Sequence, residues 1–153
     1  MVEATFRAPS TQHPAPSTQH PAPVMNVLGV GIDLVDIHRV VEMLERREEQ
    51  ALQKLLTAAE RAFVLAQPVP ARHFAARIAA KEAVYKALQS LPDARGVGWQ
   101  DLEVLRSDHG RPSIRLHGAA AELDRKHGPL LIELSLSHSE MTAGAVAVVG
   151  VAR

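Results

Sequence analysis

The stretch that decides the fold is FAARIAAKEAVYKAL, residues 74–88, which is rich in alanine and holds neither glycine nor proline. This composition predicts an α-helix, because alanine has a high helix propensity and both helix-breaking residues are absent. Projected at about 100° per residue, the helix has almost no ordinary solvated face. A bulky apolar stripe holds Phe74, Ile78, Tyr85 and Leu88, and a stripe of small side chains, open to a neighbouring backbone, holds Ala76, Ala80, Ala83 and Ala87.

The same helix carries a charged pair in a trough of small side chains. Glu82 and Lys86 lie one turn apart on a third stripe, flanked only by Ala75 and Ala79. An isolated carboxylate and its lysine among alanines indicate a place where a ligand docks. The alternative is an i,i+4 ion pair on a solvated helix, which is common and stabilises by only about 0.2–0.5 kcal/mol. The helix alone supports both interpretations about equally.

The overall composition is that of a single domain whose net charge favours neither acidic nor basic partners. The chain has 153 residues, of which 46% are hydrophobic and 22% are charged, and its formal net charge is zero. Zero net charge argues against bulk electrostatic binding of nucleic acid or of a membrane surface. The absence of cysteine excludes disulfides and a thiol nucleophile. No apolar run approaches a membrane span, and no signal-peptide pattern begins the sequence, so we expect a cytoplasmic protein.

The N-terminal segment contains an internal repeat. Residues 8–14 read APSTQHP, and residues 15–21 repeat them without change. Prolines exclude a helix there, and the repeats lack the apolar side chains that a core needs. We therefore expect residues 1–24 to form a disordered Pro-rich tail and residues 25–153 to form the folded domain.

The remaining pattern predicts an α+β domain with a small antiparallel sheet packed with helices. A capping box, Thr57 with Glu60, marks the start of a short helix after a longer one that breaks near Gln50. In chain order we expect a buried strand (27–35), the long helix (37–56), the short helix (57–63) and the alanine-rich helix (74–88). They are followed by a two-stranded ribbon (99–106 with 113–117), a further helix (118–127) and a closing hairpin (131–137 with 143–149).

An aspartate stands inside the first expected strand. Residues 29–37 read GVGIDLVDI, in which Asp33 interrupts an apolar run. A buried carboxylate is costly unless it is paired or holds a metal, and a helix cap or a salt bridge to a core cation would explain it equally well. Asp33 and Glu82 together, however, are two carboxylates from separate elements. With phosphate oxygens and water they form the ligand set that Mg²⁺ prefers.

Three segments together resemble one known family. They are GVGIDLVDI, AAKEAVYKAL and LSLSHS, at residues 29–37, 79–88 and 134–139. In this order and at these separations they resemble the holo-acyl-carrier-protein synthase family of phosphopantetheinyl transferases. The resemblance implies a 4′-phosphopantetheinyl transferase-like fold. It also implies Mg²⁺-dependent transfer of phosphopantetheine from coenzyme A to a serine of an apo acyl carrier protein, with release of 3′,5′-ADP, in fatty acid or polyketide synthesis.

The resemblance assigns the metal and phosphate chemistry to single positions. The family's strand aspartate and the glutamate of its KE pair hold magnesium, and they correspond to Asp33 and Glu82. Lys86 is expected to reach the phosphate charge from the same helical stripe. The general base is either Glu82 or a water on the metal.

The resemblance also implies residues that hold coenzyme A. Arg77 and Lys81 are expected to bind its phosphates, although side chains beside an apolar stripe otherwise only snorkel over the core. His138 lies where the final hairpin turns, and a turn with hydroxyls, amides and an imidazole can bind a phosphate. A lone histidine at a turn is otherwise simply exposed.

The helix after Asp33 is expected to dock the carrier protein. Arg39, Met43 and Arg46 suit an acidic partner helix by charge and by adaptable apolar contact, and the resemblance carries this role to Arg39 and Arg46. Neighbouring glutamates favour the alternative of a mixed-charge solvated face. The opposite, buried face is expected to hold Ile37, Val41 and Leu44.

Assembly and the main departure from the family complete the expectations. The family's short members form homotrimers with the active site between subunits, and we expect the stripe of small alanines and the final hairpin to offer the flat apolar surface. The family's Gly-Thr-Gly turn is replaced here by Gln89-Ser90-Leu91-Pro92, which changes the loop near the phosphates.

The competing functions are a non-catalytic module that binds carrier protein or coenzyme A, and a Mg²⁺-dependent nucleotide hydrolase, for which no P-loop is present.

Overall fold

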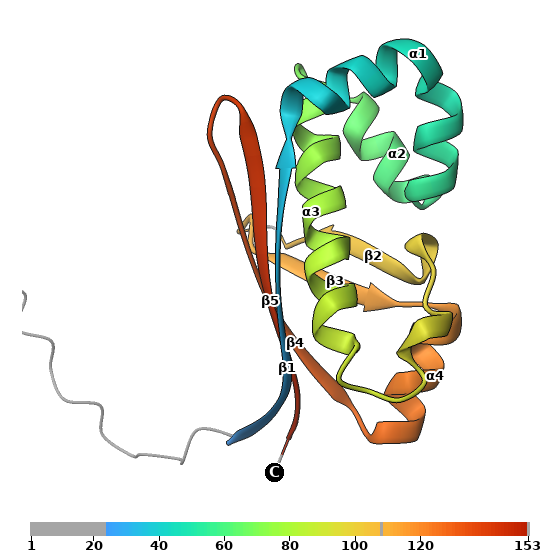
Figure 1. Ribbon diagram of the computed structural model, residues 1–153, viewed down its shortest axis with the longest axis vertical. Coiled ribbons are helices and arrows are strands. Elements are labelled where there is room, and N and C mark those ends of the chain that lie inside the picture. Colours follow the sequence, from blue (N-terminus) through green and yellow to red (C-terminus); the bar gives the residue numbers. More distant parts are fainter. Residues whose placement is uncertain (1–23, 108, 153) are drawn as a thin grey trace, which may run out of the picture.

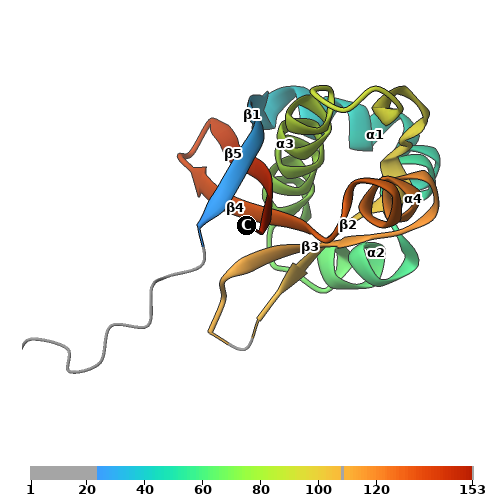
Figure 2. The same cartoon turned by 90° about the horizontal axis from the view of Figure 1, so that it is seen from below.

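A long central helix, α3 (Pro70–Leu88), lies along a three-stranded antiparallel sheet and packs most closely on two of its strands (Figure 1, Figure 2). The computed structural model describes residues 24–107 and 109–152. The sheet has the order β1-β5-β4, and the expected α+β class with a small antiparallel sheet is confirmed. These strands are β1 (Met25–Asp36), β5 (Thr142–Ala152) and β4 (Leu130–His138).

The remaining helices lie on the other side of α3, and a two-stranded ribbon beside them also contacts β4 (Figure 2). A separate antiparallel ribbon joins two short strands, and two short 3-10 turns lead from α3 into it. The bounds are α1 (Ile37–Leu55), α2 (Ala58–Leu65), η1 (Ala94–Gly96), η2 (Trp99–Asp101), β2 (Leu102–Arg106), β3 (Pro112–Leu116) and α4 (Gly118–His127). The expected tail lies outside the described residues, except for Val24.

The backbones of β1 and α3 touch directly. A Cβ built on Gly29 would lie 2.0 Å from the carbonyl oxygen of Ala87, and one on Gly31 would lie 1.9 Å from that of Ala83. Such contacts are far inside van der Waals distance, so only glycine fits at these two positions. The stripe of small alanines on α3 therefore does admit another backbone, and that backbone is β1 of the same chain.

This contact corrects the expected role of the alanine stripe in assembly. Ala80, Ala83 and Ala87 are at most 1% exposed, because β1 and the neighbouring elements cover them. These three alanines are thus covered within one subunit, and only half-buried Ala76 of the stripe keeps some exposed surface. Of the two expected apolar surfaces, only part of the final hairpin remains exposed, including Val146 of β5 at 40%.

The outer face of the sheet is apolar and exposed, contrary to the expectation of a buried first strand. Val30, Ile32 and Leu34 of β1 are 64%, 60% and 69% exposed. Alternate side chains of a strand point to opposite faces, and within the described part of the chain the helices lie on one face of the sheet only (Figure 1). An antiparallel sheet can leave its second face to solvent, but that face is then usually polar.

Several helix boundaries differ from the expected ones for local reasons. Helix α3 begins at Pro70, because a proline fits the first helical position, where its missing N–H would have no partner. Helix α1 bends at Arg47, whose φ of −151° is not helical, rather than at Gln50. The capping box of Thr57 and Glu60 at the start of α2 is confirmed. Residues 99–101 form η2, so β2 begins later than expected. No helix in the described ranges combines the length and apolarity needed to cross a membrane.

Candidate functional site

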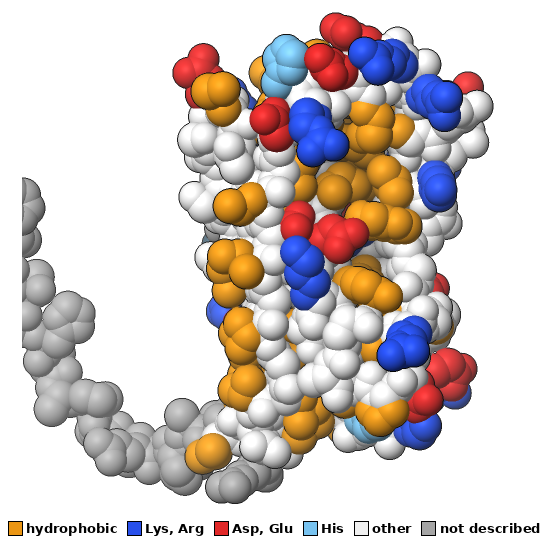
Figure 3. Space-filling model, in the orientation of Figure 1, with side chains coloured by type: hydrophobic (Ala, Val, Ile, Leu, Met, Phe, Trp, Pro, Cys, Tyr) orange, Lys and Arg blue, Asp and Glu red, His pale blue; other side chains and the backbone are white. Residues whose placement is uncertain are grey.

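The direct contact between β1 and α3 brings the strand aspartate to the charged pair of the helix. The Lys86 ammonium donates to Asp33 Oδ1 at 2.8 Å and to the carbonyl oxygen of Ile32 at 3.0 Å. The hydrogen bond to Asp33 raises the pKa of Lys86, and the negative charges of Asp33 and Glu82 act in the same direction. In Figure 3 acidic and basic side chains meet at this level, where β1 and α3 face the viewer. The predicted trio therefore forms one cluster.

The cluster stays open to solvent. The Lys86 side chain is 49% exposed and that of Asp33 is 17% exposed, while Glu82 is half-buried. Within residues 24–107 and 109–152, no group of three or more acidic, histidine or cysteine side chains is arranged to hold a metal ion. The protein thus offers two carboxylates and a half-exposed cation, and any divalent ion here would take its remaining oxygens from substrate and water.

A pocket opens next to Glu82, on the side of α3 away from the strand. Its volume is about 240 Å³, and it lies between α3 and the segment that leads into β2. Four of its seven lining residues are apolar or aromatic, which suits an organic group attached to the phosphates that the carboxylates would face. The lining residues are Lys81, Glu82, Tyr85, Val97, Gly98, Trp99 and Leu102.

The loop that replaces the family's Gly-Thr-Gly turn is folded onto the core. Leu91, Ala94 and Val97 are at most 8% exposed, and the spacing of these three residues matches the 3-10 turn between them. Lys126 of α4 forms an ion pair with Asp93 from outside. The departure in sequence therefore produces an anchored loop that ends at the wall of the pocket.

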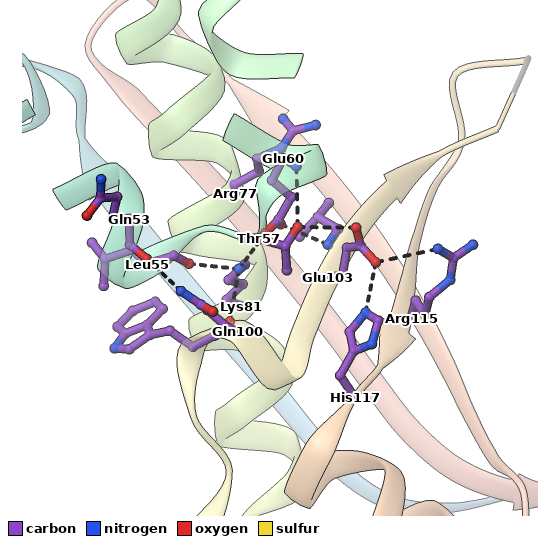
Figure 4. Close-up of polar contacts among 12 residues, drawn as sticks. Gln53, Leu55, Thr57, Glu60, Arg77, Lys81, Gln100, Glu103, Arg115 and His117 are labelled. Carbon is purple, nitrogen blue, oxygen red and sulfur yellow. Dashed lines mark hydrogen bonds and ion pairs between the residues drawn. The ribbon is translucent and has the colours of Figure 1, made fainter. Parts of the chain in front are cut away.

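Lys81 does not have the free ammonium that its expected role requires (Figure 4). Its side chain is 1% exposed, and Nζ lies 2.6 Å from Glu60 Oε2. The same nitrogen donates to the carbonyl oxygens of Leu55 at 2.8 Å and Trp99 at 2.9 Å. An ammonium has three donors, and all three are in use. The expectation that Lys81 binds a coenzyme A phosphate is therefore corrected, because the charge is buried and fully bonded.

Glu60 and Glu103 continue this buried network toward the ribbon (Figure 4). Glu60 Oε1 accepts from the backbone N–H of Val104 at 2.9 Å. Thr57 Oγ1 donates to Glu103 Oε1 at 3.1 Å, and His117 Nε2 lies 2.8 Å from Glu103 Oε2. Desolvation would raise the pKa of Glu103, but the hydrogen bonds of His117 and Thr57 hold it below its usual range. Sequence reasoning missed this network, although a glutamate between apolar neighbours at position 103 was a signal for it.

Arg77 belongs to a second cationic region, at the N-terminal end of α3. Its guanidinium lies 4.1 Å above the ring centroid of Phe63 and donates to the carbonyl oxygen of His73 at 3.4 Å. Arg77 is 5% exposed, and among the described residues its Nε has no hydrogen-bond partner. Burial lowers the pKa of Arg77.

His138 and Arg77 act on the same side chain, His73. Burial lowers the pKa of His73, and the charges of Arg77, Arg106, His138 and Arg72 lower it further. Residues from α3, β2 and β4 thus form a basic region that sequence reasoning found only in part. His138 itself is exposed at the end of β4. The hydroxyl of Ser139 accepts from Thr142 N at 3.1 Å and so belongs to the hairpin turn.

Helix α1 presents its basic residues as expected but not its apolar ones. Arg39 and Arg46 are exposed. Met43 is half-buried against the core cluster of α1 and α2, so it does not lie on the outer face. Val40 is 4% exposed and Val41 is 36% exposed, so the buried stripe runs through Val40 where Val41 was expected.

Comparison with known proteins places the fold in one family. Residues 29–146 match the family model of the 4′-phosphopantetheinyl transferase superfamily. A holo-[acyl-carrier-protein] synthase from Syntrophus aciditrophicus (strain SB) is 40% identical over 122 residues, which are 80% of this chain and 94% of that protein. The chain therefore belongs to the 4′-phosphopantetheinyl transferase superfamily and, within it, to the holo-[acyl-carrier-protein] synthases.

Two solved structures show what such proteins bind. An ACPS–CoA complex from Chronobacterium ammoniagenes is 31% identical, with a TM-score of 0.70, and the match covers 82% of this chain and 98% of that one. A holo-(acyl-carrier-protein) synthase from Bacillus anthracis str. Ames, in complex with CoA (3′,5′-ADP), is 28% identical, with a TM-score of 0.67, and the match covers 84% and 99%. The family predicted from the three motifs is confirmed.

Proposed function

We propose that this protein transfers the 4′-phosphopantetheine group of coenzyme A to a serine of an apo acyl carrier protein and releases 3′,5′-ADP. The observation that carries the proposal is the Lys86 ammonium, which is bonded to Asp33 and lies within the field of the Glu82 charge, in a chain that belongs to the holo-[acyl-carrier-protein] synthases. The names of the relatives and the coenzyme A complexes of two of them support the substrates. We place the reaction in the cytoplasm, which agrees with a chain that has no cysteine.

Asp33 and Glu82 fit a magnesium ion that is completed by substrate. Hard carboxylate oxygens suit Mg²⁺, which is commonly held by one or two carboxylates together with phosphates and water. The cation now bonded to Asp33 is the Lys86 ammonium, at 2.8 Å, so this carboxylate already faces a positive charge at its open side. When bound, the ion would neutralise and polarise the pyrophosphate oxygens of coenzyme A.

The side chains of the site supply orientation and charge for the transfer. The serine oxygen forms a bond to the β-phosphorus, the bond from that phosphorus to the bridging oxygen breaks, and 3′,5′-ADP leaves. Such a transfer depends mainly on positioning and on electrostatic stabilisation of the phosphate charge. Lys86 is charged and reaches the same space as both carboxylates, so it can stabilise the developing negative charge. The serine proton passes to a base, for which Glu82 is the candidate among the side chains of the site; a magnesium ion, if bound, would supply an activated water as the alternative.

The basic region around His73 is proposed to hold the remaining phosphate charge of coenzyme A. Exposed His138 would contact the ligand, and Arg77 would contribute its charge from just below the surface. Both residues lower the pKa of His73 through their charge, so each of them lies near that side chain, and this supports the assignment. Lys81 has no part in this binding.

The carrier protein is proposed to dock on α1. Arg39 and Arg46 are exposed on this helix and suit an acidic partner helix. Exposed Val41 can take the apolar contact that half-buried Met43 provides only in part. Charge reversal at Arg39 or Arg46 should weaken carrier binding and leave coenzyme A binding unchanged.

A homotrimer is proposed from the outer face of the sheet. Val30, Ile32 and Leu34 are each at least 60% exposed and lie beside Asp33, so a neighbouring subunit on this face would also adjoin the site. The number three comes from the family resemblance alone. Light scattering on the intact protein checks it, and a fully active monomer at assay concentration would contradict it.

Mass spectrometry of a carrier protein tests the function directly. An apo acyl carrier protein is incubated with coenzyme A, Mg²⁺ and this protein, and the expected result is a mass increase of one phosphopantetheine group. Removal of Mg²⁺ by a chelator should stop the reaction. If no fatty acid or polyketide carrier gains this mass, the non-catalytic binding module becomes the better description.

A further inference from the structure

The buried network meets the proposed active site at Lys81. Lys81 directly precedes Glu82 in α3, and both residues line the same pocket together with Trp99. Lys81 nevertheless has no donor left for a ligand, because Glu60 and two backbone carbonyls take all three. A charge with such surroundings usually costs stability through desolvation, so its place beside Glu82 needs a separate explanation.

Lys81 joins three backbone segments that are distant in sequence. The carbonyl of Leu55 lies in the last turn of α1, where carbonyls lack helical partners and a cation is favourable. The carbonyl of Trp99 belongs to η2, which forms the wall of the pocket opposite Glu82. A second link holds the same wall, because Gln100 Nε2 donates to the carbonyl oxygen of Gln53 at 2.5 Å.

Glu60 fixes the position of the ammonium from the opposite side. Its Oε2 accepts from the backbone N–H of Thr57 at 2.9 Å, and its Oε1 accepts from that of Val104 at 2.9 Å. The carboxylate is therefore held by α2 and β2 at once and cannot follow Lys81 if α3 turns or shifts. A fully bonded buried network of this kind keeps its members in one arrangement.

We propose that Lys81 is a positioning residue for the transfer reaction: held by Glu60, it fixes the Trp99 wall of the pocket against the helical turn that carries Glu82. The proposal rests on the proposed function. Lys81 does not touch coenzyme A, and its effect on the reaction passes through the backbone of η2 and the orientation of α3. The distance between the Trp99 wall and the Glu82 carboxylate then depends on a charge pair that does not contact the substrate.

The main experiment removes the charge pair and follows the only tryptophan. Lys81→Met alone leaves the Glu60 carboxylate buried without its cation, which can prevent folding. The double variant Glu60→Gln/Lys81→Met removes both charges and keeps an acceptor for Val104 N. Because the chain has a single tryptophan, its fluorescence reports on the pocket wall alone. We expect a native circular dichroism spectrum, a shifted Trp99 emission and a roughly 10- to 100-fold lower kcat/KM for coenzyme A.

Two further variants separate positioning from phosphate binding. Lys81→Arg should also have a lowered turnover, because a planar guanidinium cannot reproduce the three bonds of the ammonium to a carboxylate and two carbonyls. A lysine that only bound phosphate would tolerate this change, because arginine also binds phosphate well. Lys54→Met removes an exposed lysine of α1 and should change neither emission nor kcat/KM. A folded double variant with wild-type emission and turnover, or full activity of Lys81→Arg, would overturn the proposal.

Labelling of the wild-type protein decides the matter if the variants do not fold. An amine reagent with mass spectrometry should modify Lys86, which is 49% exposed, and coenzyme A should protect it. Lys81 should stay unmodified with and without coenzyme A, since it is 1% exposed. Modification of Lys81 that coenzyme A prevents would refute the positioning role. Absence of transfer by the wild-type protein refutes the proposed function instead, and the emission and labelling results still test the contact itself.

Discussion

Helix α3 carries two lysines, each paired with a carboxylate from another element, and one pair is buried whereas the other is open to solvent. Lys81 and Glu60 are each 1% exposed, and every donor of the ammonium has a partner within the domain. Lys86 and Asp33 form a slightly longer pair, at 2.8 Å against 2.6 Å, and Lys86 is 49% exposed. A pair that is saturated by its own fold can only position other groups. A pair that is open to solvent keeps hydrogen-bonding capacity for a ligand.

The two pairs also differ in what attaches them to the fold. The closed pair is bonded to helix ends and to the ribbon, so it connects α1, α2, α3 and β2. The open pair depends on one contact, the direct approach of β1 to α3 at Gly29 and Gly31. Exposure, and not residue type, therefore distinguishes Lys86, for which we propose a binding role, from the structural Lys81.

The largest expected effect is the loss of transfer when either carboxylate of the open site is removed. Asp33→Ala and Glu82→Ala should each lower kcat by at least about 10³-fold, because positioned electrostatic groups contribute this much to such reactions. Circular dichroism should show an intact fold, since neither side chain lies in the core. Mass spectrometry of the carrier protein measures the transfer. Glu122→Ala, which removes an exposed carboxylate of α4, is the control. Near-normal Mg²⁺-dependent turnover in either variant would contradict the metal assignment.

The second prediction removes one residue from each pair and compares the effects on activity and on stability. Lys86→Met should lower kcat by roughly 10²-fold, as loss of one charge-stabilising donor does, and leave the melting temperature nearly unchanged. Glu60→Ala should lower the free energy of unfolding by about 3–5 kcal/mol, because it leaves a buried ammonium without its partner. Thermal unfolding and carrier modification are measured on both variants. A stable Glu60→Ala protein, or an unfolded Lys86→Met protein, would remove the distinction between a closed and an open pair.

The third prediction attacks the contact on which the open pair depends. Gly31→Ala places a methyl group against the carbonyl of Ala83 and should cost about 3 kcal/mol, as severe overpacking does. Transfer should fall with stability, because β1 carries Asp33. Gly96→Ala is the matched control, since nothing lies within 4 Å of its Cβ position. Equal melting temperatures for the two variants would show that β1 and α3 can separate without loss.

The smallest expected effect is a difference in pH dependence between the two sides of α3. Glu103 of the closed network has a pKa below 4.5, so its contribution to stability is present above that pH and is lost as the pH falls through the lowered pKa. Lys86 of the open pair has a pKa above 10.5, so its contribution is present below that pH and is lost as the pH rises through the raised pKa.

Thermal unfolding across both ranges measures this difference. Glu103→Gln should flatten the acid side of the melting-temperature profile and leave the alkaline side unchanged. Lys86→Met should do the reverse. An acid profile that is the same with and without the Glu103 carboxylate would show that other groups control acid unfolding.

The sequence by itself determined most of the element types and the family, and it singled out the residues that we propose for the open site. Alanine-rich and alternating apolar patterns predicted the order of helices and strands, because local propensity and periodicity decide these elements. Asp33, Glu82 and Lys86 were found because the motifs name them, and their contact follows from the glycines and alanines that let β1 and α3 approach.

Only the tertiary structure decided which charges are free and which apolar surfaces are covered. Lys81 and Lys86 look alike in sequence, and the partners that saturate Lys81 come from Glu60, Leu55 and Trp99, which no local pattern links to it. The apolar side chains of β1, Val30, Ile32 and Leu34, lie on the face that no helix of the described residues covers, and periodicity could not tell this face from a buried one. Burial depends on contacts between residues that are distant in sequence, and periodicity reports only on neighbours along the chain.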